Sequence, residues 1–255
     1  MKKIKISVIS YLNTSPFVYG LKRSKLIDFI DLCYDTPAEC AMRLKEKDVD
    51  AGIVPAAMLP SIPDRKIISN YCIGASGKVR SVVLLANQPV DAVKNIYLDG
   101  ESRTSTLLAQ LLLKDYWKTD VSMLPLNSTD EINPDRKDAA FVLIGDKVFD
   151  YEHKFKYKED LAEAWQNFTG LPFVFATWAA VTPLTNSFIS EFNHALSTGV
   201  NNIPAAVAEH RKVLNYNDAI KYLTENIDYD FNFAKHKALV LFWNMVLKLK
   251  SKYRS

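Results

Sequence analysis

The 255-residue sequence predicts an α/β fold of two lobes, each built on a mostly parallel sheet flanked by helices. Apolar runs of strand length alternate with segments of helical periodicity, in two separate series along the chain. A further apolar run at residues 171–181 follows the second series and is expected to return the chain to the first lobe. We expect residues 1–88 and 176–255 to form one discontinuous lobe, residues 89–175 to form the other, and a ligand cleft to lie between them.

The first series of elements begins at the N-terminus. Strands are expected at residues 4–9, 30–34 and 50–55. Ser15 followed by Pro16 predicts the start of a helix, because the N–H that proline lacks has no helical partner at the first position. Thr36 and Glu39 have the spacing of a capping box, which predicts a second helix that runs through Leu44.

The second series follows an apolar strand expected at residues 81–86. Its strands are expected at residues 95–98, 121–125 and 139–144, with a helix over 104–117. From Asn186 onward the apolar residues recur at helical spacing, and a last amphipathic helix is expected over 234–249.

Charge and cysteine content narrow the class of protein. The 32 basic and 29 acidic residues give a net charge of +3, which is too balanced to suggest a nucleic-acid partner. The basic cluster at residues 248–254 is interpreted as a solvated tail. No signal-peptide pattern and no apolar run of about 18 residues is present, so we expect a cytoplasmic protein without a membrane partner. Three cysteines without a CxxC motif are expected to be reduced and mostly buried: Cys33, Cys40 and Cys72.

Several kinds of catalytic chemistry lack their motifs. The sequence contains neither of the glycine-rich phosphate-binding motifs, G-x-G-x-x-G and G-x-x-x-x-G-K-S/T, and it has only 8 glycines. No H-E-x-x-H or G-x-S-x-G motif is present. We therefore expect no metal and no cofactor, and each histidine is interpreted as a surface or structural residue: His153, His194, His210 and His236.

Two hydroxyl-rich turns are the most informative motifs. Ser10-Tyr11-Leu12-Asn13-Thr14-Ser15-Pro16 follows the first strand, and Asp99-Gly100-Glu101-Ser102-Arg103-Thr104-Ser105 precedes the helix expected over 104–117. A helix N-terminus presents unpaired N–H groups and a partial positive charge, and therefore attracts anions. Two such ends, one on each lobe, are suited to a small molecule that carries two carboxylates.

These turns and four other segments resemble one known family. The matching segments are residues 8–16, 50–55, 77–82, 98–105, 144–146 and 165–174. In this order they resemble the chorismate dehydratase family of the futalosine route to menaquinone, over about residues 4–180. The resemblance implies a periplasmic-binding-protein-like (type 2) fold in a cytosolic enzyme, with chorismate as the substrate. It also implies an active site between the lobes, which forms 3-[(1-carboxyvinyl)oxy]benzoate and water.

The second turn supplies the expected carboxylate-binding residues. Ser102, Arg103, Thr104 and Ser105 are more numerous than a helix cap requires, so we expect them to bind substrate. Two simpler interpretations stay open: Thr104 and Ser105 cap their helix, and Arg103 faces solvent.

Three other residues are expected at the site. Asn13 is interpreted as a substrate ligand because of its place in the matched motif, with a turn residue as the alternative. Ser81 occupies a plausible cleft position or is a strand-end hydroxyl, and Arg80 is expected to face solvent by strand alternation. Asp146 either holds a backbone turn or faces the cleft as a substrate-binding residue.

The identity of the base is the open question in the chemistry. The matched turns offer Asp99 and Glu101 but no histidine. We hypothesise that the enolpyruvyl carboxylate of the substrate removes the C3 proton, while Asn13 and Ser81 orient it or assist the departing hydroxyl. Loss of the C4 hydroxyl and the C3 hydrogen makes the ring aromatic, so the enzyme mainly has to position its substrate.

Three alternative functions compete with this interpretation. A solute-binding protein for a small carboxylate would share the fold, although no export signal is seen. The second alternative is the sister enzyme of the same pathway, which makes dihydroxynaphthoate. Resemblance to that family would imply a cleft that contains a histidine base. An inactive interaction protein has no positive support. The sequence makes no prediction of the oligomeric state.

Overall fold

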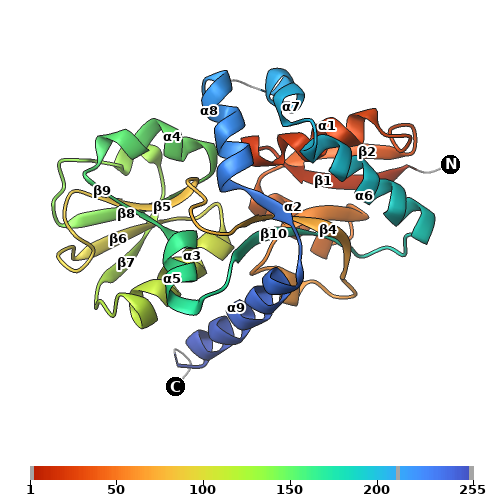
Figure 1. Cartoon of the computed structure of the whole chain (residues 1–255). Coiled ribbons are helices and arrows are strands. Elements are labelled where there is room, and N and C mark those ends of the chain that lie inside the picture. Colours follow the sequence, from red (N-terminus) through yellow and green to blue (C-terminus); the bar gives the residue numbers. More distant parts are fainter. Residues whose placement is uncertain (1–2, 211–212, 253–255) are drawn as a thin grey trace. The chain divides into compact units, whose positions relative to one another are not determined.

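The computed structural model describes residues 3–210 and 213–252. The chain divides into two compact units, each made of two stretches of the sequence that can be followed by the colour bar of Figure 1. Unit 1 comprises Met1–Gly74 and Val174–Phe233, and unit 2 comprises Ala75–Phe173 and Ala234–Ser255. The chain therefore passes between the units three times, which is one crossing more than the sequence pattern predicts.

Unit 1 is built on a six-stranded sheet with the strand order β11-β4-β10-β3-β1-β2. Its strands are β1 (Ile4–Ile9), β2 (Ile30–Asp35), β3 (Ala51–Pro55), β4 (Lys66–Ala75), β10 (Phe173–Ala180) and β11 (Asp228–Asp230). β1 pairs in parallel with β2 and β3, whereas β10 and β3 pair antiparallel, as do β11 and β4. β3 and β10 are buried along their whole length and form the centre of this sheet.

The helices of unit 1 follow the sequence signals closely at their starts. They are α1 (Ser15–Arg23), α2 (Pro37–Lys45), α6 (Asn186–Val200), α7 (Ile203–Glu209) and α8 (Tyr216–Lys221), with short helical turns η1 (Leu12–Thr14), η2 (Leu59–Ser61) and η7 (Tyr222–Asn226). The predicted capping box of α2 is confirmed: the Thr36 hydroxyl accepts from the Glu39 N–H, and the Glu39 carboxylate accepts from the Thr36 N–H at 2.7 Å.

The start of α1 differs by one residue from the prediction. Ser15 is already the first helical residue, and its hydroxyl donates to the Leu12 carbonyl at 2.7 Å instead of capping the helix. Pro16 therefore stands at the second helical position, where the missing N–H again removes no helical hydrogen bond. The turn η1 and helix α1 thus follow β1 without a loop between them.

Two glycines allow α1 and α6 to pack with their backbones in contact. A Cβ atom on Gly199 would lie 1.7 Å from the Pro16 carbonyl oxygen, and one on Gly20 would lie 1.9 Å from the Ala195 carbonyl oxygen. Only glycine permits this approach. Phe17 of α1 packs edge-on against Trp178 of β10, with 5.7 Å between the ring centroids, so the helix pair is also anchored to the sheet.

Unit 2 is built on a five-stranded sheet with the order β7-β6-β8-β5-β9. Its strands are β5 (Val82–Ala86), β6 (Asn95–Asp99), β7 (Ser122–Leu126), β8 (Ala139–Ile144) and β9 (Tyr157–Asp160). Its helices are α3 (Arg103–Leu111), α4 (Val148–Tyr151), α5 (Leu161–Thr169) and α9 (Phe233–Lys252), with short turns η3 (Leu112–Tyr116), η4 (Thr129–Glu131), η5 (Gly145–Lys147) and η6 (Glu152–Lys154). β6 pairs in parallel with β7 and β8, and β5 pairs antiparallel with β8 and β9.

The predicted α/β class is confirmed, but strand direction differs in detail from the mostly parallel sheets expected. Both sheets are mixed. The antiparallel pairs arise at the strands next to the crossings, because β5 and β10 enter their sheets directly from the other unit without a βα crossover.

The division of the chain also differs from the predicted boundaries, which grouped residues 1–88 with 176–255. In the structure, β5 lies in the sheet of unit 2, where it pairs with β8 and β9. Phe242 of α9 packs edge-on against Trp165 of α5 and against Phe173, the last residue of unit 2 before the chain crosses into the rest of β10, with centroid separations of 6.1 and 5.2 Å. Residues 75–88 and the last helix therefore belong to unit 2.

The three cysteines are free thiols in different surroundings. Cys40 is fully buried and its Sγ lies 2.7 Å from the Ser7 hydroxyl; burial raises the pKa of its thiol to about 12 although that hydrogen bond opposes the shift. Cys33 is only half-buried, and Arg43 donates to its Sγ at 3.5 Å. The expectation of mostly buried thiols is confirmed for Cys40 and Cys72.

This difference predicts selective alkylation. Treatment of the native protein with iodoacetamide at pH 8 is expected to modify Cys33 first, because Cys40 is inaccessible and only about one molecule in ten thousand carries its thiolate at that pH. Peptide mass spectrometry at successive times measures the order, and denatured protein provides the control in which all three thiols react. Equal rates at Cys33 and Cys40 in the native protein would contradict the packing around Ser7.

Candidate functional site

Unit 2 brings several of the predicted site residues to one edge of its sheet. β6 and β8 run parallel, with Leu98 opposite Val142, so their carboxyl ends lie at the same edge. β5 runs antiparallel to β8 and begins there, with Val82 opposite Ile144. The Gly145 N–H donates to the Ser81 carbonyl at 2.9 Å across this edge. The edge therefore gathers three predicted groups: Ser81, the turn that contains Ser102–Ser105, and Asp146.

The N-terminus of α3 carries a pair of hydroxyls. Ser102 is the N-cap, and its hydroxyl accepts from the Ser105 N–H at 3.3 Å, while the two hydroxyl oxygens lie 3.1 Å apart. Thr104 is completely buried and Ser105 nearly so. The interpretation that Thr104 and Ser105 cap the helix is therefore wrong, because Ser102 is the cap. The Ser105 hydroxyl lies beside the helix start, where N–H groups face outward.

Arg103 is the first residue of α3 and its side chain is exposed. Among the described residues no hydrogen bond or ion pair holds its guanidinium. The solvent-facing interpretation therefore describes the structure without a ligand. An uncommitted guanidinium beside a helix N-terminus can also form two parallel hydrogen bonds to a carboxylate, so its binding role stays a prediction.

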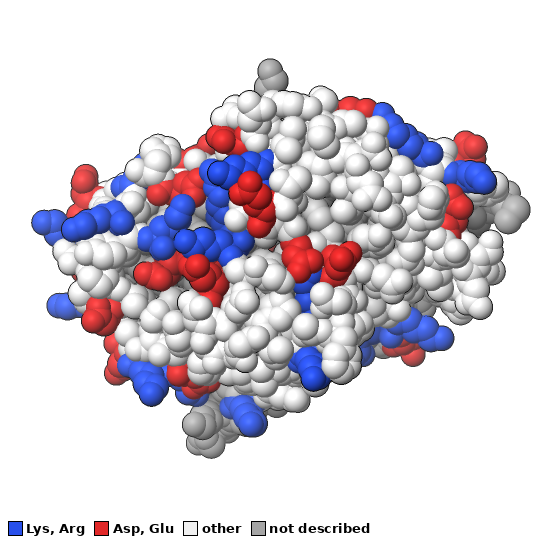
Figure 2. Space-filling view, viewed as in Figure 1, with Lys and Arg blue, Asp and Glu red and all other residues white. Residues whose placement is uncertain are grey.

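A partly buried set of ion pairs, in which only Asp99 is fully enclosed, shapes the turn before α3. Lys147 Nζ lies 2.9 Å from Asp99 Oδ2 and 3.1 Å from Glu101 Oε1. The other Asp99 oxygen accepts from the Glu101 N–H at 3.1 Å, which closes the turn. Burial opposes the charge on Lys147, but its contacts with Asp99 and Glu101 hold the pKa of its ammonium above the usual value. Asp99 is thus committed to a structural ion pair. Figure 2 shows acidic and basic side chains interleaved over unit 2, on the left of the view.

Replacing Lys147 by methionine is expected to lower the free energy of unfolding by about 2 kcal/mol, because Asp99 would stay buried without its countercharge. Since the folded pKa of Lys147 is raised, this contribution is present below the ordinary lysine pKa. It is lost as the pH rises through the folded value, so the difference from wild type closes above about pH 10.4.

Chemical denaturation at several pH values measures this difference. Lys221→Met is the matched control, because Lys221 and Glu225 form an exposed pair whose loss is expected to change stability by about 0.5 kcal/mol or less. A Lys147→Met protein as stable as this control at neutral pH would show that Asp99 does not depend on the ion pair.

The segment before Ser81 is held in place by a buried carboxylate. Asp160, the N-cap of α5, accepts from the backbone N–H groups of Val79 and Arg80 at 3.2 and 2.7 Å. Burial raises the pKa of Asp160, although these hydrogen bonds act in the opposite direction. Ser81 itself is 2% exposed. Asp160 holds the two residues before it, and the Gly145 N–H binds its own carbonyl, so its position is well defined.

The structure corrects the expectation that Arg80 faces solvent by strand alternation. Arg80 has a left-handed backbone with φ of 64°, so it lies in a turn before β5 rather than in the strand. Its guanidinium donates to Glu152 at 2.8 and 3.2 Å. Burial opposes the charge on Glu152, but Arg80 and Lys158 hold the pKa of its carboxyl below the usual value.

Asp146 is 9% exposed and lies in the tight turn η5 between β8 and α4. Gly145, which precedes it, has a φ of 67°, a conformation that favours glycine. The turn interpretation therefore describes its backbone. A substrate-binding role for its carboxylate stays a prediction.

In unit 1, Asn13 lies in η1 between β1 and α1 and is 9% exposed. Its backbone carbonyl accepts from the Tyr229 hydroxyl at 3.0 Å, and burial raises the pKa of that phenol well above its usual value. The Asn13 side chain has no hydrogen-bond partner among the described residues. The amide is not among the buried side-chain atoms that lack a partner, so it is open to solvent or to a ligand.

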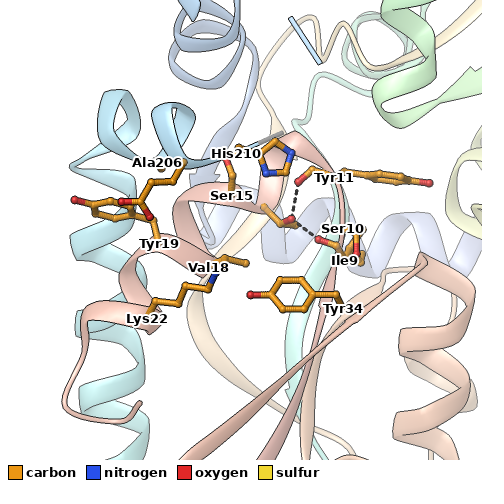
Figure 3. A pocket seen from close by; sticks show the side chains of 12 residues that line it. Ile9, Ser10, Tyr11, Ser15, Val18, Tyr19, Lys22, Tyr34, Ala206 and His210 are labelled. Carbon is orange, nitrogen blue, oxygen red and sulfur yellow. Dashed lines mark hydrogen bonds between the residues drawn. The ribbon is translucent and has the colours of Figure 1, made fainter. Parts of the chain in front are cut away.

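A cavity of about 160 Å³ lies next to this turn within unit 1 (Figure 3). It is lined by Ile9, Ser10, Tyr11, Thr14, Ser15, Val18, Tyr19, Lys22, Tyr34, Ala206, Glu209 and His210. Lys22 extends toward Tyr34, with 5.7 Å between its Nζ and the ring centroid. The cavity therefore combines hydroxyls of the Ser10–Pro16 turn with an ammonium and an imidazole.

Sequence reasoning missed three residues that bear on the site. His210 lines the cavity, although no motif distinguishes it from the other histidines. Lys147 and Tyr229 support the turns that carry Asp99 and Asn13. For Lys147, its place soon after the end of β8 was the available signal, since such positions lie at the ligand-binding edge of α/β sheets.

The fold is that of periplasmic binding proteins, as predicted. Protein AF1704 from Archaeoglobus fulgidus superposes with a TM-score of 0.77 at 15% identity, over 97% of this chain and 98% of that one. The periplasmic aliphatic sulphonate binding protein SsuA from Escherichia coli superposes with a TM-score of 0.65 at 14% identity, over 100% and 93% of the two chains. Likeness at this level of identity defines the fold alone.

Sequence comparison identifies the family. The family model described as menaquinone biosynthesis matches residues 4–248. A chorismate dehydratase from Thermus thermophilus is 23% identical over 231 residues, which cover 84% of each chain. The chain therefore belongs to the menaquinone biosynthesis family, in agreement with the resemblance carried by its sequence motifs.

Proposed function

We propose that this chain is a chorismate dehydratase, a hydro-lyase that converts chorismate to 3-[(1-carboxyvinyl)oxy]benzoate and water on the futalosine route to menaquinone. The observation that carries the proposal is the α3 N-terminus of a menaquinone biosynthesis family member, with its paired hydroxyls and uncommitted Arg103. The relative named chorismate dehydratase supports the same reaction.

The chemistry of the substrate matches this helix end. Chorismate carries a ring carboxylate and an enolpyruvyl carboxylate. The N–H groups at the start of α3, the Ser105 hydroxyl and Arg103 would each donate to one carboxylate, and charge-assisted hydrogen bonds of this kind are the strong ones. Asn13 would hold the other end of the molecule. That residues of both units bind one ligand stays a prediction.

The elimination needs one proton acceptor and one leaving group. In our proposal the enolpyruvyl carboxylate accepts the C3 proton, the C3–H electron pair forms the new ring double bond, and the C4–O bond breaks. The departing hydroxide takes up the proton that the carboxyl group has accepted and leaves as water, so the carboxylate is restored and the ring becomes aromatic. Asn13 and Ser81 would orient the carboxylate and assist the leaving hydroxyl, so positioning provides most of the acceleration.

Incubation of the purified chain with chorismate tests the function. We expect the aromatic product to appear by chromatography and ultraviolet absorbance, in many turnovers per enzyme. Tight binding of chorismate by calorimetry without any turnover would instead favour a small-carboxylate binding protein. If the chain neither binds chorismate nor converts it, the proposal is overturned.

Substrate-assisted catalysis makes a specific prediction for the acidic residues near α3. Single replacement of Asp99 by Asn, Glu101 by Gln and Asp146 by Asn is expected to leave measurable turnover, because none of them accepts the C3 proton. Steady-state rates measure turnover, and calorimetry measures chorismate binding. Complete loss of turnover in one variant that still binds chorismate would identify a side-chain base and refute this mechanism.

The sister enzyme that makes dihydroxynaphthoate is the second candidate, because His210 lines the cavity beside Ser10 and Tyr11. A histidine in that position is a candidate base. If the chain is a chorismate dehydratase, the His210→Gln variant keeps its activity on chorismate. Loss of that activity with binding intact would transfer the role of the base to His210.

A further inference from the structure

We propose that the outward face of helix α9 docks on an anionic lipid surface. α9 comprises Phe233–Lys252, and in Figure 1 it is the dark blue helix that leads to the C-terminal end. Within residues 3–210 and 213–252 the structure has no helix long and apolar enough to span a bilayer. The proposed contact is therefore peripheral.

One face of α9 accounts for its packing within unit 2. Phe242 is 1% exposed and lies against Trp165 and Phe173. Ala238, Leu239, Val246 and Leu249 are buried on the same side. These residues form the apolar face by which α9 packs on the core of unit 2, as expected for a helix on the surface of a globular protein.

The opposite face exposes several apolar side chains, with the polar His236 and Asn244 among them. Phe233, Val240 and Leu247 are 73%, 52% and 65% exposed, and they recur at a spacing of about two helical turns, which places them along one stripe. Trp243, which is half-buried, lies one turn from two of them. This outward stripe, defined by Phe233, Val240, Trp243 and Leu247, runs for about 21 Å along the helix. Isolated exposed apolar residues are ordinary, but an aligned set on one helix marks an interaction surface.

The charge around the stripe indicates the partner. Residues 231–255 contain no Asp or Glu. Lys235 is fully buried, whereas Lys237 and Lys248 are exposed and lie beside Val240 and Leu247. A second copy packed through the same face would bring lysines against lysines, without a carboxylate on the helix to pair with them. A helix with aromatic and aliphatic residues on one face and lysines at its border is typical of segments that lie in the headgroup region of a bilayer.

This proposal departs from the sequence-based expectations of a solvated basic tail and of no membrane partner. The basic run begins within a helix, since Lys248 belongs to α9. Lys248, at the start of that run, borders an apolar face that sequence periodicity alone did not distinguish from the core.

Co-sedimentation of the full chain with vesicles tests the proposal. We expect binding to phosphatidylcholine vesicles that contain phosphatidylglycerol, and about tenfold weaker binding to phosphatidylcholine alone or in high salt. The double variant Val240→Glu/Leu247→Glu is expected to lose binding. Met42→Glu, which charges an equally exposed apolar residue on α2, is expected to keep it.

Three results would overturn the proposal. They are the absence of binding by folded wild-type protein, binding that the double variant retains, and a solution dimer that the double variant dissociates without any vesicle binding. Circular dichroism establishes that the double variant is folded. Should it fail to fold, the charge-reversed Lys237→Glu/Lys248→Glu protein replaces it, with the same expected loss of vesicle binding.

Discussion

Replacement of Asn13 by alanine is expected to lower kcat for chorismate about 100-fold, with no loss of stability. Loss of one positioned hydrogen-bond donor at a reacting group typically has an effect of this size. Stability should be kept, because the Asn13 amide has no partner among the described residues, so its removal breaks no hydrogen bond. The backbone of η1 remains held by the Tyr229 hydroxyl.

Steady-state kinetics and thermal denaturation of the same preparation measure both effects. Asn217→Ala, which removes an exposed asparagine on α8, is the matched control and should leave rate and stability unchanged. A large loss of stability in Asn13→Ala would indicate a structural amide. Wild-type kcat in that variant would remove Asn13 from the reaction.

Replacement of Gly199 by alanine is expected to destabilise the protein by about 3 kcal/mol or more. The added Cβ would lie 1.7 Å from the Pro16 carbonyl oxygen. That oxygen belongs to the backbone of α1 and Gly199 belongs to α6, so the clash is relieved only if one of the two helices moves. Because Pro16 follows Asn13 closely in the same turn, such movement should also reduce activity in protein that remains folded.

Urea denaturation measures the change, with Gly100→Ala as the control. A Cβ on Gly100 would meet no atom within 4 Å, so that variant should stay close to wild type in stability. Equal stability of the two variants would show that α1 and α6 do not need their close approach.

The sequence predicts those parts of the fold that local chemistry determines. The capping box at Thr36 and Glu39 appears as predicted, and the strand expected at residues 139–144 has those bounds. β4 escapes prediction because Ser69 and Asn70 interrupt its apolar residues and hide the period of a strand. β9 escapes because it is short and mostly charged. Pairing with β5 makes it a strand, and that contact is not local in sequence.

The same distinction applies to the candidate site. Ser102 at a helix start can be predicted from residue type, since hydroxyls there satisfy N–H groups. The partner of Asp99 cannot, because Lys147 lies far along the chain and reaches it only through the pairing of β6 with β8. The buried face of α9 cannot be predicted from its sequence either. Which of its apolar residues are buried depends on the positions of Trp165 and Phe173, which are distant in sequence.

Dehydration of chorismate is tested most directly by a nuclear magnetic resonance time course with ring-labelled ¹³C chorismate and a catalytic amount of the purified chain. We predict that the olefinic and sp³ ring signals of chorismate disappear as the aromatic ring carbons of 3-[(1-carboxyvinyl)oxy]benzoate appear, in an enzyme-dependent reaction that the Asn13→Ala variant slows. An unchanged chorismate spectrum in the presence of folded, chorismate-binding protein would contradict the proposed function.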